Sequence, residues 1–367
     1  MQRREFLAAT SALALAPRLS AHAKERLIQQ GDEYDAYAKL AANENPYGPP
    51  ESVMQAMTQA FKYANRYGYP DGNIVAEIAR HHGVKPENVL LGAGSGELLD
   101  AAGTAFLAGG KKVVCADPTF DSVYAHATSI RADAIWIPLA EDFCQDIAAT
   151  IHAAKSYERE CGFVYLCNPN NPTGRIVTKS EVKTLLDGVP ADMPVLIDEA
   201  YHHFVESHDY ATSVPYVLEG RPVIVTRTFS KIAALAGMRL GYAVAPAELI
   251  RQMRPYTMGS INALVKWGGV AALKDTDSQA NVRRITLDLR KKTVAQLGAA
   301  GFSVIPSEAN FFMVDIRRPV QSVIPRFREQ GVLVGRPFPP MMQHLRVSVG
   351  TADEMARFIA AFTKIVV

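Results

Sequence analysis

A lysine with apolar neighbours is the most reactive group that this sequence suggests. Lys231 lies in the apolar segment 229–233, directly after Ser230. Apolar surroundings favour the neutral amine, which is nucleophilic and can form a Schiff base with a carbonyl compound. Arg239 follows eight residues later as a cation near the same segment. A solvated surface lysine is the ordinary alternative, so the interpretation depends on the groups that accompany Lys231.

Further polar groups follow other apolar runs. Asp198 comes directly after the run 195–197, and Tyr201 lies three residues beyond it. This carboxylate and phenol could point into one cleft, or they could be a capped turn and a core tyrosine. The loop 168–174 contains two prolines and a glycine, which would hold the amide of Asn171 rigidly as a hydrogen-bond donor.

A turn of small residues follows the first of these runs. The run 89–91 leads into Gly-Ala-Gly-Ser-Gly-Glu at residues 92–97, where free backbone N–H groups at the start of a helix could bind a phosphate. A dinucleotide fold would use Asp117 for a ribose contact, but Glu97 occupies its third glycine position. A plain strand-to-helix turn remains the alternative.

The elements that position these residues follow from hydrophobic patterning. Short apolar runs alternate with longer amphipathic segments, which suits strands covered on both faces and crossover helices. This pattern predicts a large three-layer α/β/α domain over residues 65–250, with ligands at the carboxyl ends of the strands. A different pattern after residue 250 predicts a smaller α+β domain over 251–367. The expected strands of the large domain are 89–91, 112–116, 134–137, 163–167, 195–197, 223–226 and 240–244.

The N-terminal part divides into two segments. Residues 24–64 form a turn-rich arm that is predicted to join the smaller domain. Residues 1–23 resemble a twin-arginine export signal, with Arg3-Arg4, an apolar stretch from 7 to 16 and Ala-His-Ala at 21–23. The stretch is too short to span a membrane, so no permanent anchor is expected. We expect a periplasmic or exported protein, or a cytoplasmic one if the signal is not functional.

Composition excludes several classes of protein. The 39 basic and 37 acidic residues give a formal charge of +2, which offers no general attraction to nucleic acid. A hydrophobic fraction of 48% excludes intrinsic disorder. The four cysteines lack zinc-site spacing and are interpreted as core thiols. The adjacent pairs His81-His82 and His202-His203 lack a completing carboxylate, so no metal site is predicted.

Together these motifs resemble the class I and II aminotransferases of fold type I, which depend on pyridoxal phosphate, and especially the histidinol-phosphate aminotransferase branch. The resemblance extends from Leu40 to the C-terminus. It is carried in order by Gly92 to Glu97, Asn171 to Gly174, Asp198 to Tyr201, Ser230-Lys231 and Arg239, and the branch is matched by Asn43 to Gly48, Asn65 to Tyr67 and Leu345 to Thr351.

The resemblance implies catalytic roles for three of these residues. Lys231 would bind pyridoxal 5'-phosphate covalently and then shuttle a proton from the substrate. Asp198 would keep the pyridine nitrogen protonated, which makes the ring a better electron sink. Tyr201, together with Asn171, would hydrogen-bond the ring oxygen.

The resemblance also implies the rest of the site. Phe120 would stack on the cofactor ring. The phosphate would be held by Ser95, Gly96, Ser230 and Arg239, and by Tyr67 of a neighbouring subunit, which implies a homodimer. The anionic group of the substrate would be bound by Arg346, Arg336 and Tyr47.

The function implied is transfer of an amino group from an amino acid or amine phosphate to a 2-oxo acid. A lyase or decarboxylase on the same scaffold is the alternative among enzymes, because the phosphate and lysine motifs do not determine which bond breaks. A non-catalytic periplasmic binding protein is the alternative from another class. Lys231 and Asp198 argue against it, since simple binding requires neither.

Overall fold

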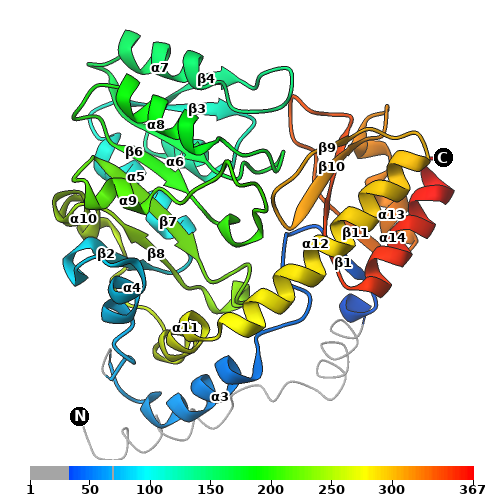
Figure 1. Cartoon of the computed structure of the whole chain (residues 1–367), viewed down its shortest axis with the longest axis horizontal. Helices are drawn as coiled ribbons and strands as arrows, with labels where there is room; N and C mark the ends of the chain where they lie inside the picture. Colours follow the sequence, from blue (N-terminus) through cyan, green and yellow to red (C-terminus); the bar gives the residue numbers. More distant parts are fainter. Residues whose placement is uncertain (1–32, 68–69) are drawn as a thin grey trace, which may run out of the picture.

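The computed structural model describes residues 33–67 and 70–367, so the predicted export signal at 1–23 lies outside the described residues. The chain forms a large domain around a seven-stranded sheet and a smaller domain around a three-stranded and a two-stranded sheet. Figure 1 shows the two domains side by side, with the long helix α12 (Thr276–Ala299) running between them. The predicted α/β architecture is confirmed.

The large sheet has the strand order β2-β8-β7-β6-β5-β3-β4. All seven predicted runs are strands: β2 (Val89–Gly92), β3 (Lys112–Asp117), β4 (Asp133–Pro138), β5 (Cys161–Cys167), β6 (Val195–Asp198), β7 (Val223–Thr228) and β8 (Gly241–Val244). Strand β8 is antiparallel to both β2 and β7, whereas the other neighbours are parallel. Strand β2 therefore ends, and β8 begins, at the edge where β5, β6 and β7 end.

Alternating side chains of the strands build two separate cores. In β5, Phe163 and Tyr165 lie in one core, while Val164 and Leu166 lie in the other. This period of two is expected for a sheet covered on both faces. One face is covered by α4 (Ile74–His82), α7 (Ile147–Ser156), α8 (Lys179–Gly188), α9 (Val214–Leu218) and α11 (Ala263–Lys274), and the other by α5 (Ser95–Phe106), α6 (Ser122–Ser129) and α10 (Ala247–Met253).

The smaller domain has its own core, rich in phenylalanine. Its antiparallel sheet has the order β12-β10-β9, and a parallel pair joins β1 to β11. Phe327 and Phe358 stack in this core with ring centres 5.8 Å apart. The elements are β1 (Ala38–Leu40), β9 (Val304–Ile305), β10 (Phe311–Asp315), α13 (Ile324–Glu329), β11 (Val332–Val334), β12 (His344–Ser348) and α14 (Ala352–Ile365).

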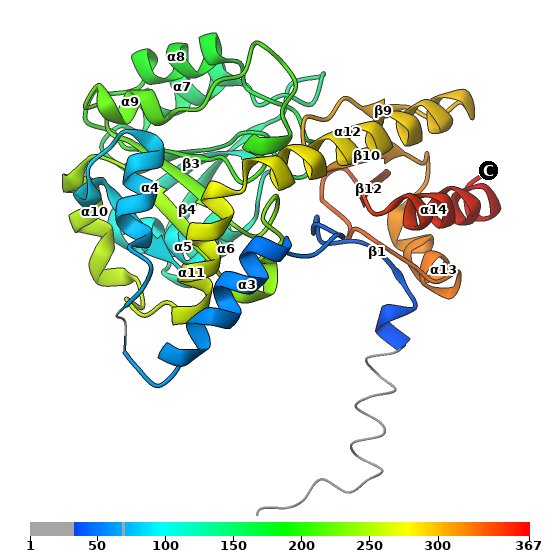
Figure 2. The same ribbon diagram turned by 60° about the horizontal axis from the view of Figure 1, so that its bottom comes forward.

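The arm that precedes the large sheet divides between the two cores. Strand β1 belongs to the smaller core, but helix α3 (Glu51–Ala60) packs against α11 and buries Val53 and Met57 in the larger core. Figure 2 shows α3 lying along α11. The prediction that the whole arm joins the smaller domain is wrong for α3, because its apolar face packs against α11, a helix about 200 residues away.

Among the described residues, no helix is both long enough and apolar enough to cross a membrane.

Candidate active site

A cavity between the two domains brings together many of the predicted site residues. It lies at the edge of the large sheet where β5, β6 and β7 end, and strand β12 of the smaller domain closes its other side. Its lining includes Ala42, Asn43, Thr119, Phe120, Asp121, Asn171, Tyr201, Lys231, Arg336, Phe338 and Arg346. Placement at strand ends between two domains is typical of an enzyme cleft.

Lys231 lies in this cleft beside Tyr201. Its Nζ donates to the carbonyl oxygen of Ala42 over 3.2 Å and lies 5.7 Å from the centre of the Tyr201 ring. Burial, and secondarily the cation of Arg346, lower the pKa of Lys231 to about 8. A substantial fraction of this amine is therefore neutral near pH 8, as a nucleophile requires.

Asp198 is a buried carboxylate at the end of β6. Its Oδ1 accepts from Thr226 Oγ1 at 3.1 Å and its Oδ2 accepts from Tyr165 OH at 3.4 Å. Burial raises the pKa of Asp198 to about 6, although these hydrogen bonds and one from the backbone of Ala200 lower it. Within the described chain no cation pairs with Asp198. A cationic ligand group would stabilise this carboxylate.

Two amides converge on the Tyr201 hydroxyl. Asn43 Nδ2 donates to it over 3.1 Å and Asn171 Nδ2 over 3.4 Å. Burial raises the pKa of Tyr201 to about 12, so the phenol stays protonated and can donate to a ligand. Asn43 was missed as a site residue, although it belongs to the Asn43–Gly48 segment that matches the histidinol-phosphate branch.

The predicted phosphate-binding residues meet at the N-terminus of α5. Arg239 Nη2 donates to the carbonyl oxygen of Ala93 over 3.0 Å, and a side chain at Gly94, where φ is +84°, would collide with the Arg239 guanidinium. Gly241 is equally constrained, because a Cβ there would collide with the backbone of Ser95. A Cβ at Gly96 would meet nothing within 4 Å. The turn is thus tightly packed at Gly94 and against Gly241 but open at Gly96, where backbone N–H groups can bind an anion.

Ser230 supplies a hydroxyl near this turn. Its Oγ accepts from Thr228 Oγ1 at 2.8 Å, and its backbone N–H donates back to Thr228 Oγ1 over 3.0 Å. Thr228 lies opposite Gly241 in the pairing of β7 with β8, and Gly241 lies opposite Gly92 in the pairing with β2. The sheet register therefore brings the segments of Ser95, Ser230 and Arg239 to one place.

Arg346 is the buried cation of the cleft. Its Nη1 donates to Asn171 Oδ1 over 2.7 Å and its Nη2 to the carbonyl oxygen of Ala41 over 2.6 Å, both neutral acceptors. Its Nε is buried and has no hydrogen-bond partner among the described residues. Burial lowers the pKa of Arg346 to about 10. A buried guanidinium without a carboxylate partner is suited to an anionic substrate group.

The remaining predicted residues occupy different places. Arg336 lines the cleft and pairs with Asp121, and Phe120 lines the same cleft. Tyr47 instead lines a neighbouring cavity with Asn45 and Ile232, so within this chain it is not brought to Arg346. Tyr67 is fully exposed and lies outside the cleft of its own chain.

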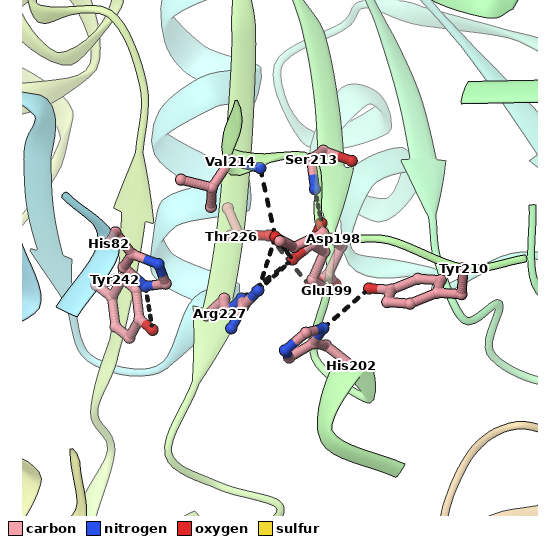
Figure 3. A network of polar contacts seen from close by, with 11 residues as sticks. His82, Asp198, Glu199, His202, Tyr210, Ser213, Val214, Thr226, Arg227 and Tyr242 are labelled. Carbon is pink, nitrogen blue, oxygen red and sulfur yellow. Dashed lines mark hydrogen bonds and ion pairs between the residues drawn. The ribbon is translucent and has the colours of Figure 1, made fainter. Parts of the chain in front are cut away.

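A buried polar network beside Asp198 was not predicted. Glu199 accepts from Arg227 Nε at 3.1 Å and Nη2 at 2.7 Å, from Thr212 Oγ1 at 2.9 Å and from the backbone of Ser213 at 2.6 Å. Figure 3 shows this ion pair next to Asp198 and Thr226, with Tyr242 and His82 beyond. The pair anchors the backbone that follows Asp198. The sequence alone does not show that the adjacent carboxylates of Asp198 and Glu199 have different partners.

The two histidine pairs lie near this network. His82 shares a 2.9 Å hydrogen bond with the Tyr242 hydroxyl, and His202 a 3.3 Å one with Tyr210. Burial, and secondarily the Arg227 cation, lower the pKa of His82 to about 3 and that of His202 to about 2. In the part of the chain that the structure describes, no group of three or more His, Cys, Asp and Glu side chains is arranged to hold a metal ion.

Comparison with known proteins identifies the family. The family model for aminotransferase class I and II matches residues 36–362. This chain belongs to that family. The histidinol-phosphate aminotransferase of Moorella thermoacetica is 37% identical over 334 residues, which cover 89% of this chain and 85% of the relative. Histidinol-phosphate aminotransferase 2 of Carboxydothermus hydrogenoformans is 36% identical over 330 residues, or 88% of this chain and 89% of the relative.

Solved structures of aminotransferases share the fold. One from Erwinia carotovora atroseptica, named as a putative histidinol-phosphate aminotransferase, matches with a TM-score of 0.87 and 30% identity over 90% of this chain and 97% of its own. The Sinorhizobium meliloti histidinol-phosphate aminotransferase, solved with pyridoxal-5'-phosphate, matches with a TM-score of 0.84 and 24% identity over 96% of this chain and 99% of its own. The chain is a pyridoxal-phosphate-dependent aminotransferase, and its fold is fold type I.

The residues of this aminotransferase fit that cofactor. Lys231 offers an amine for its aldehyde, unpaired Asp198 a carboxylate for its protonated ring nitrogen, and Phe120 a ring at the cleft wall. The open turn at Ser95 and Gly96, with Ser230 and Arg239, would hold its phosphate. When bound, pyridoxal phosphate takes up the amino group and accepts the electron pair left on the substrate carbon. Lys231 Nζ, when neutral, can take the proton from that carbon and return it.

Proposed function

We propose that this aminotransferase acts on donors whose amine lies close to an anionic group, and that a 2-oxo acid accepts the amino group. The anionic group is either the carboxylate of an amino acid or the phosphate of an amine phosphate. Histidinol phosphate is the amine phosphate to test first, because the most similar relatives described above are named for it.

The unpaired guanidinium of Arg346 carries this proposal. It lies in the same cleft as Lys231, and the two cations are close enough for Arg346 to lower the pKa of Lys231. A donor whose anion meets Arg346 therefore has its amine within reach of the Lys231 position. The bound anion also supplies a counter-ion to the buried Arg346 guanidinium. Anionic substrates should therefore bind more tightly than neutral amines.

A panel of amino donors tests the proposal. Holoenzyme is mixed with each donor without an acceptor, and loss of the absorbance of the lysine-bound cofactor is followed together with formation of the 2-oxo product or the corresponding carbonyl compound. We expect donors with an anionic group to react and simple amines of equal size to fail. Arg346→Gln should remove this preference. Release of ammonia or carbon dioxide instead of a carbonyl product would favour a lyase or decarboxylase.

We further propose that the enzyme is a homodimer and is exported by a twin-arginine signal. The exposed position of Tyr67 is suited to a contact with a neighbouring subunit, as the family resemblance implies. The export signal rests on Arg3-Arg4 and the short apolar stretch that follows.

A further inference from the structure

An ion pair between the two domains lies beside Arg346 in the cleft. Arg336, in the loop after β11, directs Nη2 to the Oδ2 atom of Asp121, which directly precedes α6 of the large domain. Both side chains line the cleft that contains Lys231. Asp121 also follows Phe120, so its carboxylate lies beside the residue predicted to stack on the cofactor ring.

The two arginines of the cleft thus differ in charge compensation. Both guanidinium groups lie against Phe338, with distances to its ring centre of 4.6 Å for Arg346 and 4.3 Å for Arg336. Arg336 is paired with a carboxylate, whereas the hydrogen bonds of Arg346 go to neutral oxygens. Asp121 is near enough to act on Arg346 as well. The cleft therefore offers one uncompensated guanidinium and one carboxylate beside it.

We infer that Asp121 is a specificity-determining residue that restricts the cleft to donors with a single carboxylate and disfavours donors with a phosphate. This inference rests on the proposed function and selects between its two donor classes. One guanidinium can bind and neutralise a carboxylate through two parallel hydrogen bonds. A phosphate monoester carries a charge of about −1.5 to −2 at neutral pH, so one guanidinium leaves part of that charge uncompensated.

Asp121, the carboxylate that pairs with Arg336, would also repel the phosphate of a donor. A phosphate at Arg346 would lie near Asp121, and it could recruit Arg336 only by taking that cation from Asp121. Either event leaves an anion unpaired at the cleft wall, a cost that a monoanionic donor avoids. Without Asp121, Arg336 becomes a second cation next to Phe338.

Asp121→Asn removes the charge with little other change. Asp121 is half exposed and its side chain makes no capping hydrogen bond to α6, so the helix start does not depend on the carboxylate. Histidine and histidinol phosphate are a related pair of donors, because they share the imidazole and the amine and differ in a carboxylate against a phosphorylated CH2–O group. We expect Asp121→Asn to raise kcat/KM for histidinol phosphate relative to histidine about tenfold at low salt, and less at high salt.

A binding measurement supplies a readout independent of turnover. Inorganic phosphate and acetate are titrated into holoenzyme by calorimetry, and Asp121→Asn should strengthen the binding of phosphate more than the binding of acetate. Arg336→Gln in the same chain should reduce both gains, because part of each acts through the freed cation. Asp187→Asn is the matched control: it also removes a carboxylate paired with an arginine, Arg221, but on α8 outside the cleft.

The inference fails if Asp121→Asn changes both donors by the same factor or lowers the use of histidinol phosphate. Failure of the proposed function gives a different result. In that case neither histidine, histidinol phosphate nor other anionic donors would convert the cofactor in the unmodified enzyme, whereas phosphate binding would still report on the charge at Asp121.

Discussion

Arg346 of the smaller domain donates from Nη1 to Oδ1 of Asn171 in the large domain over 2.7 Å. This contact orients the amide, because its oxygen faces the guanidinium and its Nδ2 must then face the Tyr201 hydroxyl 3.4 Å away. One side chain thereby connects the predicted substrate-binding arginine to the predicted cofactor-binding phenol. The effect of a substitution at Asn171 should therefore depend on the charge of the new side chain as well as on its shape.

Replacing Asn171 with Asp should block Arg346, the cation of the enzyme that is predicted to bind the anionic group of the substrate. The new carboxylate would pair with Arg346 at the same position, so the anion of a donor would meet a neutralised guanidinium. We expect kcat/KM for anionic donors to fall about 100-fold, as loss of a charge-assisted hydrogen bond of 1.5 to 3 kcal/mol allows. Asn171→Ala is the control, since it removes the amide without adding charge. Equal losses in the two variants would refute the charge argument.

The amine of Lys231 should set the pH dependence of cofactor loading. With the pKa of Lys231 lowered to about 8, the neutral fraction rises about tenfold per pH unit below pH 8 and levels off above it. An unperturbed lysine would continue to gain reactivity up to about pH 10.4. The measurement is the rate at which cofactor-free enzyme forms the lysine-bound absorbance between pH 6 and 10.

Two variants sharpen this test. Arg346→Met removes a cation that lowers the pKa of Lys231, so the levelling-off should move to higher pH. Lys231→Ala should bind cofactor non-covalently, stay folded and lose turnover. Near-normal transamination by Lys231→Ala would overturn the assignment of this lysine.

Asp198→Asn should stabilise the cofactor-free protein while crippling the loaded enzyme. Burial raises the pKa of Asp198 to about 6 in the folded state, above the ordinary value of 3.8. The folded state therefore binds a proton more tightly, and stability falls as pH rises from about 4 through about 6. Above pH 6 the ionised carboxylate costs about 2 to 3 kcal/mol of unfolding free energy, which the amide avoids.

Denaturant unfolding of cofactor-free protein at pH 7 and pH 4 measures this effect. The advantage of Asp198→Asn should be present at pH 7 and vanish near pH 4, while turnover of the loaded enzyme drops at least 100-fold because an amide cannot balance a protonated ring. Asp187→Asn should show no such gain, since hydrogen bonds from Lys183 and Arg221 lower the pKa of Asp187. An unchanged turnover in Asp198→Asn would mean that Asp198 is merely structural.

The sequence predicted most of the strands because each is a continuous apolar run with a polar residue at its end. Asp198, Asn171 and Lys231 meet for this reason: they follow parallel strands, whose carboxyl ends share one edge. The antiparallel direction of β8 could not be predicted from the sequence, since a buried strand has the same apolar pattern in either direction. Strand β1 is three residues long and gave no periodicity to detect.

Contacts between distant segments were harder to predict. The Asp121–Arg336 pair joins residues 215 positions apart, and neither neighbourhood alone shows that the charges meet. The Glu199–Arg227 pair depends in the same way on two neighbouring strands and on the residues 212–213 that close around Glu199. Tyr47 was predicted at the substrate site from its motif, but the fold turns it to an adjacent cavity of its own chain.

Tyr67 tests the predicted dimer. If its hydroxyl reaches the phosphate site of a partner, Tyr67→Phe and Lys231→Ala chains should complement each other when mixed. A hybrid dimer would then have one site with both defects and one with neither, so activity should exceed the sum of the separate variants. Tyr157→Phe is the control, because Tyr157 is an exposed tyrosine directly after helix α7 of the large domain. Activity equal to the sum of the two separate variants would exclude a shared site.

The last prediction concerns location and rests on linkage between folding and cofactor binding. Pyridoxal phosphate binds the folded state and stabilises it, so it should be loaded where it is made, in the cytoplasm. A chain threaded unfolded through a membrane would have to find the cofactor afterwards. A twin-arginine route carries folded proteins and removes that difficulty, which favours a mature protein that begins near Lys24.

Replacing Arg3 and Arg4 with lysine should therefore leave an active enzyme in the cytoplasm, with residues 1–23 still attached. Arg18→Lys, which alters a third arginine of the same segment outside the twin-arginine motif, should be exported normally and cleaved. Cell fractionation with mass spectrometry of the N-terminus distinguishes these outcomes. An unmodified protein found in the cytosol with Phe6 and Leu7 intact would refute export and would place the enzyme beside cytosolic amine phosphates, the donor class that Asp121 is inferred to disfavour.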